Sequence, residues 1–346
     1  MERVRRMLLL TVSISVLSVL AVMALTFDEG TILALERIDP WFFLLALCAH
    51  LLGYVFGAVR MRSLTHGMGY TVSLRRCMSI VFHNLFLAAI TPSMMGGEPI
   101  RIHMLKESGV PYGKAGVVVF GERILDGLFF IVAIPMVIVL YHYLGRSTFM
   151  LMLATSAVLL IGLVALIAYA LRKPYRVGRL GRMALISIVG VSLKLVGKLM
   201  RKPPTSSRIV EIVDAEIRAF RDGLRELLGQ GRGSVPMAFA STLGYWIAQY
   251  SVVVWVLLGL VGNVDLVEVV PRAFAAQIVL SMLMILPLTP GASGIAEAGA
   301  LALFGSFTPS SVLGVLVIGW RAVHYYFDVV FGGLYNLMSL RRLSET

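Results

Sequence analysis

Long stretches without any charged side chain are the feature that most restricts what this sequence can fold into. Residues 7–27 comprise about 21 amino acids and include no Asp, Glu, Lys or Arg. A helix of that length crosses a hydrocarbon core of about 30 Å, because each residue adds about 1.5 Å. The chain is 58% hydrophobic and only 14% charged, whereas about 25% of the residues in soluble proteins are charged. We therefore expect an all-α integral membrane protein in which residues 1–346 form a single transmembrane domain.

Six segments are predicted to cross the membrane as helices. The first is interpreted as uncleaved, since a signal peptide has a shorter apolar region followed by a small-residue cleavage site. Arg60, Arg62, Arg75 and Arg76 follow the second segment and are interpreted as cytoplasmic residues. The six segments are residues 7–27, 41–59, 115–144, 148–171, 237–262 and 310–340.

Charges between the spans predict their orientation. Residues 28–39 carry four acidic residues and one arginine, and the connection after residue 262 reads GNVDLVEVV. Residues 172–235 hold fourteen Lys and Arg against five Asp and Glu. Basic loops stay in the cytoplasm, so we expect a multi-pass protein of the cytoplasmic membrane with both termini inside. This rule also accounts for the net charge of +12. No nucleic-acid partner is expected, since basic platforms interleaved with aromatic residues are absent.

Two apolar segments do not fit as plain spans. Residues 77–91 run into PSMMGGEP, and residues 273–289 run into PGASGIAE and a second short apolar piece, 298–304. Pro and Gly break helices, and the freed backbone groups need partners at bilayer depth. We predict two re-entrant helical hairpins; the alternative is a kinked span plus an interfacial helix. The predicted turn residues are Thr91, Pro92, Gly96, Gly97, Thr289, Pro290, Gly291 and Gly294.

The two hairpins belong to an internal repeat. A shift of 198 residues places Thr91-Pro92 on Thr289-Pro290 and Arg123 on Arg321. Residues 40–144 and 237–340 therefore form two halves, each read as span, hairpin, span. With the predicted topology the halves have opposite orientations, and such inverted repeats are typical of secondary transporters with sites near the midplane.

Residues 172–235 connect the halves and are predicted to be a cytoplasmic amphipathic segment. Residues 209–228 show a single apolar stripe with charged residues on the other face. Residues 183–196 have basic flanks and contain Lys194, which suits a helix lying at the inner surface. If residues 183–196 spanned the membrane instead, the two halves would be parallel.

Charged residues at bilayer depth are the candidate substrate-binding site. Each costs at least about 2.5–3.5 kcal/mol on insertion scales, so they seldom lie there without a partner or a task. They are either structural ion pairs or a polar path in which arginines bind an anion such as a phosphate. For His83 and His324 a packed helix-interface role is at least as plausible. The predicted site comprises Glu98, Arg101, Glu122, Arg123, Asp126, Glu297, Arg321 and Asp328.

Three runs resemble a known family: TPSMMGGEPIRIHMLKESG, GERILDG and PLTPGASGIAE. They are similar to the flippase-like transmembrane region of the lysylphosphatidylglycerol synthases, which also occurs in YbhN-like bacterial and archaeal membrane proteins. The similarity covers about residues 7–340, and Pro99 directly after Glu98 departs from it. It implies translocation of a lipid, with the headgroup carried through the protein and the tails left in the bilayer. In the synthases a separate soluble domain makes the lipid, and we expect no such domain here.

Three functions are consistent with these residues. The first is flipping or scrambling of an anionic phospholipid or polyprenyl-phosphate-type lipid, with Arg101, Arg123 and Arg321 contacting the headgroup. The second is ion-coupled transport of a small soluble solute, with Glu98, Glu122 and Asp126 as proton or cation sites. The third is a membrane-embedded lipid-modifying enzyme, which no nucleophile or paired carboxylates support.

We expect a transporter and not an enzyme, without catalytic residues, metal or cofactor, since no metal-ligand or nucleotide-binding motif is present. Its expected partners are membrane lipids. A separate lipid-synthesising enzyme and a second copy of the chain are further candidates.

Overall fold

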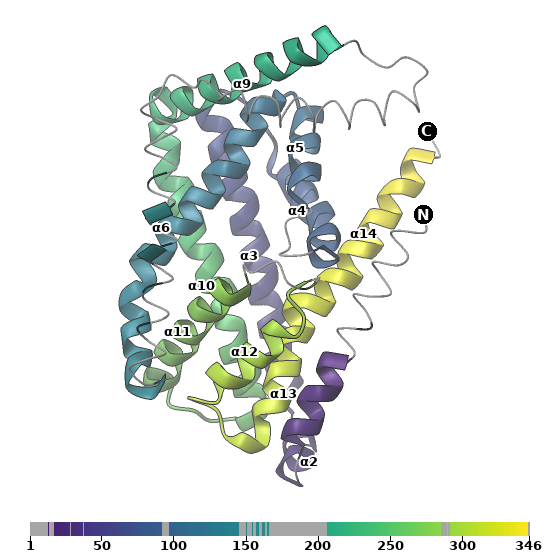
Figure 1. Ribbon diagram of the computed structural model, residues 1–346. Helices are drawn as coiled ribbons and strands as arrows, with labels where there is room; N and C mark the ends of the chain where they lie inside the picture. The colour runs from purple at the N-terminus through teal and green to yellow at the C-terminus, as the bar shows by residue number, and fades with distance from the viewer. Residues whose placement is uncertain are drawn as a thin grey trace.

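The computed structural model describes residues 17–27, 29–36, 38–91, 97–144, 206–284 and 291–344, together with residues 13, 150, 154, 157, 158, 161, 162, 165 and 289. Every regular element within these residues is a helix. Helices α3 (Pro40–Gly67) and α10 (Ser234–Val261) run side by side through the centre of the molecule (Figure 1). The predicted all-helical fold is thus confirmed for this part of the chain.

Four helices of the described residues are long and apolar enough to cross a membrane. They are Pro40–Gly67, Gln230–Val261, Leu266–Met284 and Ser310–Ser339. Three of them correspond to the predicted spans 41–59, 237–262 and 310–340, and the protein is a multi-pass membrane protein. The predicted span 115–144 lies within α6 (Tyr112–Leu144). Residues 148–171 lie mostly outside the described residues, so the count of six spans stays a prediction.

The predicted hairpin arms are helices that begin earlier than expected. The first hairpin consists of α4 (Leu74–Ala89) and α5 (Glu98–Glu107), and the second of α11 (Leu266–Met284) and α12 (Ile295–Phe304). Residue 273 was the predicted start of α11, but the Asp265 carboxylate accepts a hydrogen bond from the Val267 N–H (2.9 Å) and caps the helix there. With this correction α11 has 19 residues and is long enough to cross a membrane, so for the second segment both the re-entrant hairpin and its alternative, a kinked span followed by a short helix, stay predictions. Residues 92–96 and 285–288, between the arms, lie outside the described part of the chain.

Helix contacts between the two halves are reciprocal. Helices α3 and α10, which the repeat equates, pack on each other. Helix α4 of the first half packs on α14 (Phe327–Ser344), and its counterpart α11 packs on α6. Within the halves, the contacts of α4 with α5 and of α5 with α6 match those of α11 with α12 and of α12 with α13 (Ser310–Arg321). The elements that the predicted repeat equates therefore have matching neighbours in the described residues.

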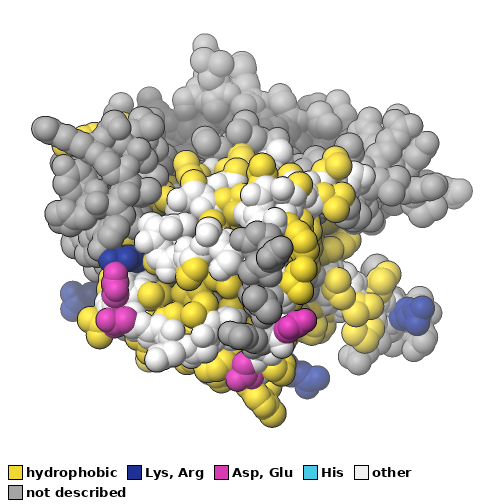
Figure 2. Space-filling view, turned by 90° about the horizontal axis from the view of Figure 1, so that it is seen from below, with side chains coloured by type: hydrophobic (Ala, Val, Ile, Leu, Met, Phe, Trp, Pro, Cys, Tyr) yellow, Lys and Arg dark blue, Asp and Glu magenta, His cyan; other side chains and the backbone are white. Residues whose placement is uncertain are grey.

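The α4–α5 pair and the α11–α12 pair occupy opposite halves of the molecule. Helices α4 and α5 lie in the half nearer α9 (Ser206–Leu228), and α11 and α12 lie in the other half (Figure 1). The connection from α10 to α11, which contains Asp265, and the start of α3 at Asp39 lie at the end opposite α9. Figure 2 views this end, where a few acidic and basic side chains stand around a surface of mixed apolar and uncharged groups. The acidic connections predicted to share one side of the membrane thus lie at one end.

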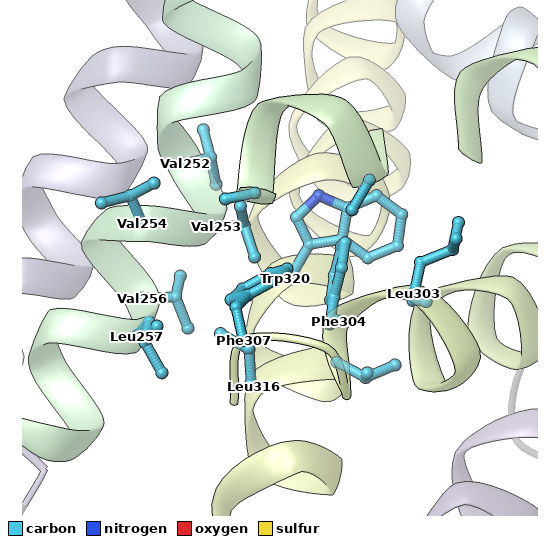
Figure 3. Packing of buried hydrophobic residues seen from close by; sticks show 14 of the residues in the cluster. Val252, Val253, Val254, Val256, Leu257, Leu303, Phe304, Phe307, Leu316 and Trp320 are labelled. Atoms are coloured by element: carbon cyan, nitrogen blue, oxygen red, sulfur yellow. The ribbon is translucent and has the colours of Figure 1, made fainter. Parts of the chain in front are cut away.

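Buried apolar side chains form two main cores. One surrounds α10 and is filled by α11, α12 and α13, with Trp320, Phe304 and Leu316 at its centre (Figure 3). The other joins α3, α4, α5 and α6 around residues such as Met61 and Leu105. Polar groups are concentrated between these cores.

Helix α9 is amphipathic and lies across one end of the bundle (Figure 1). This confirms the stripe predicted in residues 209–228: Phe220, Leu224 and Leu227 pack on the core around α3 and α6. Residues 183–196 lie outside the described residues, so their interfacial placement is untested.

Gly113 sets how closely α6 and α9 approach. A Cβ atom at this position would lie 2.1 Å from the Glu216 carbonyl oxygen. Because that oxygen belongs to the backbone, the clash can be removed only if the two helices move apart. We expect Gly113→Ala to destabilise the folded protein by about 1–3 kcal/mol, as overpacking does. Gly116→Ala is the matched control on the same helix, since its Cβ would meet only the Phe220 ring at 3.4 Å. Thermal unfolding in detergent measures both; equal melting temperatures would contradict the close packing of α9.

Candidate functional site

The turns of the two hairpins touch each other. The Gly291 N–H donates to the Thr91 carbonyl oxygen (3.3 Å). The Thr91 hydroxyl donates back to the Leu87 carbonyl oxygen in the last turn of α4 (2.8 Å), whereas the Thr289 hydroxyl donates forward to that of Ser293 (2.7 Å). Pro92, Gly96 and Pro290 of the predicted turns lie outside the described residues, and Gly97 and Gly294 directly precede α5 and α12.

Tyr325 holds the two turns together. Its hydroxyl donates to the Ala89 carbonyl oxygen at the end of α4 (3.4 Å). A Cβ atom on Gly291, which has a φ of +57°, would lie 2.2 Å from the Tyr325 ring, so only glycine lets the second turn lie flat on this ring. Tyr325 belongs to a π-helical turn, η3 (Ala322–Tyr326), that interrupts the last span. Such turns are frequent at functional sites.

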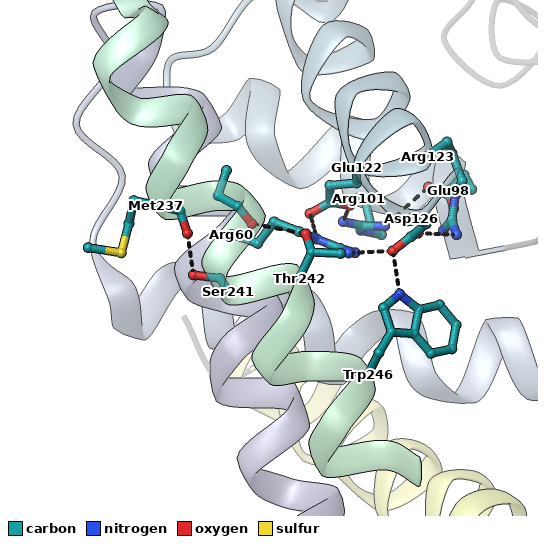
Figure 4. A network of polar contacts seen from close by, with 11 residues as sticks. Arg60, Glu98, Arg101, Glu122, Arg123, Asp126, Met237, Ser241, Thr242 and Trp246 are labelled. Carbon is teal, nitrogen blue, oxygen red and sulfur yellow. Dashed lines mark hydrogen bonds and ion pairs between the residues drawn. The ribbon is translucent and has the colours of Figure 1, made fainter. Parts of the chain in front are cut away.

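Six charged side chains form one network in the first half of the molecule (Figure 4). Arg60 donates to Asp126 (2.7 Å) and lies 3.6 Å from Glu122. Arg101 binds Glu122 and Glu98, the latter at 3.3 Å. Arg123 donates to Asp126 (3.1 Å) and Glu98. Three guanidinium groups therefore alternate with three carboxylates, as the structural ion-pair interpretation of the sequence expects.

One member of this network is open to a ligand. The Glu122 carboxylate is fully buried, and Arg60 and Arg101 are each 7% exposed. Arg123 is 55% exposed, although it binds two carboxylates. The Trp246 indole N–H donates to Asp126 (3.0 Å) and fixes the carboxylate that Arg123 contacts. The buried pairs therefore form a rigid support, and Arg123 is the arginine that an incoming anion can reach.

The second half contains a smaller counterpart. Arg321 donates to Glu297 (2.8 Å) and to the Ser293 hydroxyl (3.0 Å), and its guanidinium lies over the Tyr325 ring at 4.2 Å. Arg123 and Arg321 each bind the glutamate in the first turn of the helix after the hairpin turn, as expected if the two are equivalent. They differ in exposure, since the Arg321 side chain is 1% exposed.

A third polar group lies where α3, α10 and the last span meet. The His50 ring contacts Gln249 through Nδ1 (2.7 Å) and Asp328 through Nε2 (3.0 Å). The Tyr54 hydroxyl donates to the same carboxylate. Asp328 was predicted as a site residue, and the structure gives it two partners, His50 and Tyr54, with Gln249 on the far side of the His50 ring.

A cavity of about 810 Å³ joins all three groups. Seven of the eight predicted site residues line it; the eighth, Glu297, lies behind Arg321. Apolar side chains such as Val81, Leu85 and Phe130 share the lining with the charges. The lining residues that the sequence did not predict include Arg60, His50, Tyr54, Trp246 and Gln249.

Arg60 requires a correction. It was interpreted as a cytoplasmic residue after a span ending at residue 59. Helix α3 instead continues to Gly67, and Arg60 is buried, with 6% of the whole residue exposed. Its charge is tolerated there because Asp126 and Glu122 neutralise it. The sequence held a signal for this: Glu98, Glu122 and Asp126 outnumber Arg101 and Arg123 by one, so a further cation was needed.

Comparison with known proteins relates the chain to other membrane proteins. The chain is 28% identical over 325 residues to a UPF0104 membrane protein of Archaeoglobus fulgidus, covering 93% of this chain and 94% of the relative. It is 25% identical over 336 residues to a UPF0104 membrane protein of Methanocaldococcus jannaschii, covering 96% and 95%. It is also 25% identical over 338 residues to the glycosyltransferase AglD of Haloferax volcanii, covering 93% of this chain but 52% of that protein.

The model of one family matches residues 8–332, nearly the whole chain, and its description is the transmembrane region of lysylphosphatidylglycerol synthase. The chain therefore belongs to the family of the lysylphosphatidylglycerol synthase transmembrane region.

Proposed function

We propose that this protein moves an anionic lipid between the leaflets of the cytoplasmic membrane, with the headgroup passing through the cavity between the hairpins. The observation that carries this proposal is a cavity of about 810 Å³ in which an accessible arginine, Arg123, is held by buried ion pairs. Guanidinium groups bind phosphate through paired hydrogen bonds and stay charged at all physiological pH values.

The lining favours a lipid over a small soluble solute. Beside the charges, Val81, Leu85, Ala88, Val119 and Phe130 give the cavity an apolar wall. A lipid has a charged headgroup next to apolar chains, so both parts of the wall find a complement in one molecule. The family description names a phospholipid, lysylphosphatidylglycerol. Ion-coupled transport of a soluble solute remains the alternative; it leaves the apolar wall without a role.

The helix arrangement supports alternating access through an inverted repeat of six spans and two re-entrant hairpins. Helices α5 and α12 have ten residues each, about 15 Å, which is half of a bilayer core. Their hairpins lie in opposite halves of the molecule, and their turns meet at Thr91 and Gly291 (Figure 1). We place the α9 end and both termini in the cytoplasm and the acidic end outside, in accord with the basic connector.

In this account the headgroup phosphate binds Arg123 and takes the place of Glu98 or Asp126, while Arg60 and Arg101 stay paired and keep the site in position. The protein carries out no covalent chemistry. A separate enzyme makes the lipid, and the protein's partner in the membrane is the lipid itself.

Reconstitution tests the proposal. Purified protein is reconstituted in liposomes that contain phosphatidylglycerol labelled at one acyl chain, and a membrane-impermeant quencher is added. The quencher reaches only the outer-leaflet half of the label directly, so lipid transfer should appear as additional quenching of label that began in the inner leaflet. A vesicle with heat-denatured protein is the control. Equal quenching in both vesicles would contradict lipid transfer, and accumulation of a labelled product of different mass would point to an enzyme.

A further inference from the structure

The charged groups around the cavity are not balanced. Among the described residues, those that line the cavity or pair with its lining include four arginines and five carboxylates. Each arginine is held by Glu98, Glu122, Asp126 or Glu297. The carboxylate left over is Asp328, whose ion-pair partner in the described part of the chain is His50. An uncompensated carboxylate at bilayer depth is costly, so one additional positive charge is needed here.

Hydrogen-bond geometry places that charge on His50. The ring is almost completely buried, at 2% exposed, and both of its nitrogens face oxygen atoms. Nδ1 faces the Gln249 Oε1 atom, which can only accept (2.7 Å), and Nε2 faces the Asp328 carboxylate (3.0 Å). A neutral imidazole has one N–H, whereas the protonated ring has two. The Tyr54 hydroxyl also lies 2.7 Å from Nε2, but it donates its proton to Asp328 and so presents an oxygen lone pair to the ring. With that arrangement only the protonated ring can donate to both Gln249 and Asp328.

Within the part of the chain that the structure describes, the other charged groups near Asp328 already have partners of their own. The nearby titratable and charged groups are Tyr54 and Arg60 on α3, Tyr245 on α10, Asp126 on α6, and Arg321 and His324 on the last span. Both arginines are held by other carboxylates, and Tyr54 donates to Asp328. From α4, Phe82 packs against Tyr54, while His83 contacts Ser79 and Tyr335.

His324 is a second histidine next to the His50–Asp328 pair. Its ring lies 4.9 Å from that of His50 and lines the same cavity. Its Nδ1 atom is buried and makes no hydrogen bond within the described residues. Two adjacent buried positive charges repel each other, so His324 stays neutral while His50 carries the proton.

We propose that the His50–Asp328 pair is a proton-binding site and that its proton travels with the anionic headgroup. One proton and one negatively charged headgroup cross together, so the step moves no net charge. The coupling rests on the proposed lipid transfer, whereas proton binding does not. Histidine suits the task because it exchanges its proton near neutral pH.

Proton binding is tested without any lipid movement. Protein labelled with ¹⁵N-histidine is reconstituted in liposomes, and the His50 signals are identified by their loss in His50→Gln. We expect both His50 nitrogens to carry protons at neutral pH in the native chain and only one in Asp328→Asn. Tyr54→Phe, which keeps the packing of the ring, should retain the protonated form over a narrower pH range. A neutral His50 throughout about pH 5–8 in the native chain would overturn the proposal.

Coupling is tested in liposomes with a pH gradient of about one unit. A gradient of one pH unit provides about 1.4 kcal/mol per proton, and about 1.4 kcal/mol corresponds to a tenfold concentration ratio. With one proton per lipid, the labelled phosphatidylglycerol should therefore distribute between the leaflets with a ratio of about ten. Asp328→Asn should abolish the asymmetry, and the exposed Asp222→Asn on α9 should retain it. Transfer that ignores the gradient in the native chain would refute coupling and leave the proposed function intact. Absence of transfer would refute both, and the histidine spectra would still decide proton binding.

Discussion

Replacing Arg123 with alanine is expected to slow phosphatidylglycerol transfer by about 10- to 100-fold. Hydrogen bonds to charged groups contribute about 1.5–3 kcal/mol each, and about 1.4 kcal/mol changes a rate tenfold. Arg123 is the exposed arginine of the ion network, and its loss removes the phosphate contact while Asp126 keeps its pair with Arg60 (2.7 Å) and Glu98 keeps its pair with Arg101 (3.3 Å). The quenching assay in liposomes measures the rate, and thermal unfolding checks that the protein remains folded.

Arg76→Ala is the matched control for this variant. Arg76 also forms an ion pair, with Glu107 at 2.7 Å, but it lies outside the cavity lining. Its replacement should leave the transfer rate within about twofold of the native value. Arg123→Lys should fall between the two, because lysine keeps the charge and loses the paired geometry. Native transfer rates in Arg123→Ala would remove Arg123 from the lipid path.

Replacing Glu122 with glutamine is expected to destabilise the protein by about 3–5 kcal/mol, the usual cost of removing one partner from a buried ion pair. Glu122 is fully buried and contacts both Arg60 and Arg101, so the substitution leaves two buried guanidinium groups with fewer carboxylates than they need. The effect should be visible as a lower melting temperature in detergent.

Glu107→Gln is the control for the stability of the network. Glu107 pairs with Arg76 at the surface and is 53% exposed, and exposed pairs contribute only about 0–1 kcal/mol. If Glu122→Gln unfolded at the same temperature as Glu107→Gln, water would have to reach the buried arginines. The interpretation of Arg60 and Arg101 as a rigid support for Arg123 would then be wrong.

Elements with a local signal could be predicted from the sequence. Apolar runs located three spans, and Pro-Gly clusters located the breaks between α4 and α5 and between α11 and α12. Charges in apolar surroundings identified eight residues, seven of which line one cavity. Such features can be read from the sequence because a charge or a helix breaker within an apolar segment is unfavourable at its own position, whatever packs around it.

Features that depend on packing between the halves could not be predicted. His50 and Asp328 are separated by 278 residues and meet only because α3 packs beside α10 and the last span. Arg60 looked like the basic edge of a loop, since its carboxylate partners lie on a different helix. The start of α11 was missed because the polar stretch before it, which resembled a loop, supplies the helix cap at Asp265.

The location of the headgroup tests the central claim most directly. Phosphatidylglycerol with a photoactivatable group on its headgroup is irradiated in proteoliposomes, and the adducts are mapped by mass spectrometry. The account predicts adducts on cavity-lining residues of α6 and α10, such as Gly127, Phe130 and Trp246, that unlabelled lipid suppresses and Arg123→Ala reduces. Adducts confined to outward-facing residues such as Trp41 and Leu334, unchanged in Arg123→Ala, would contradict it.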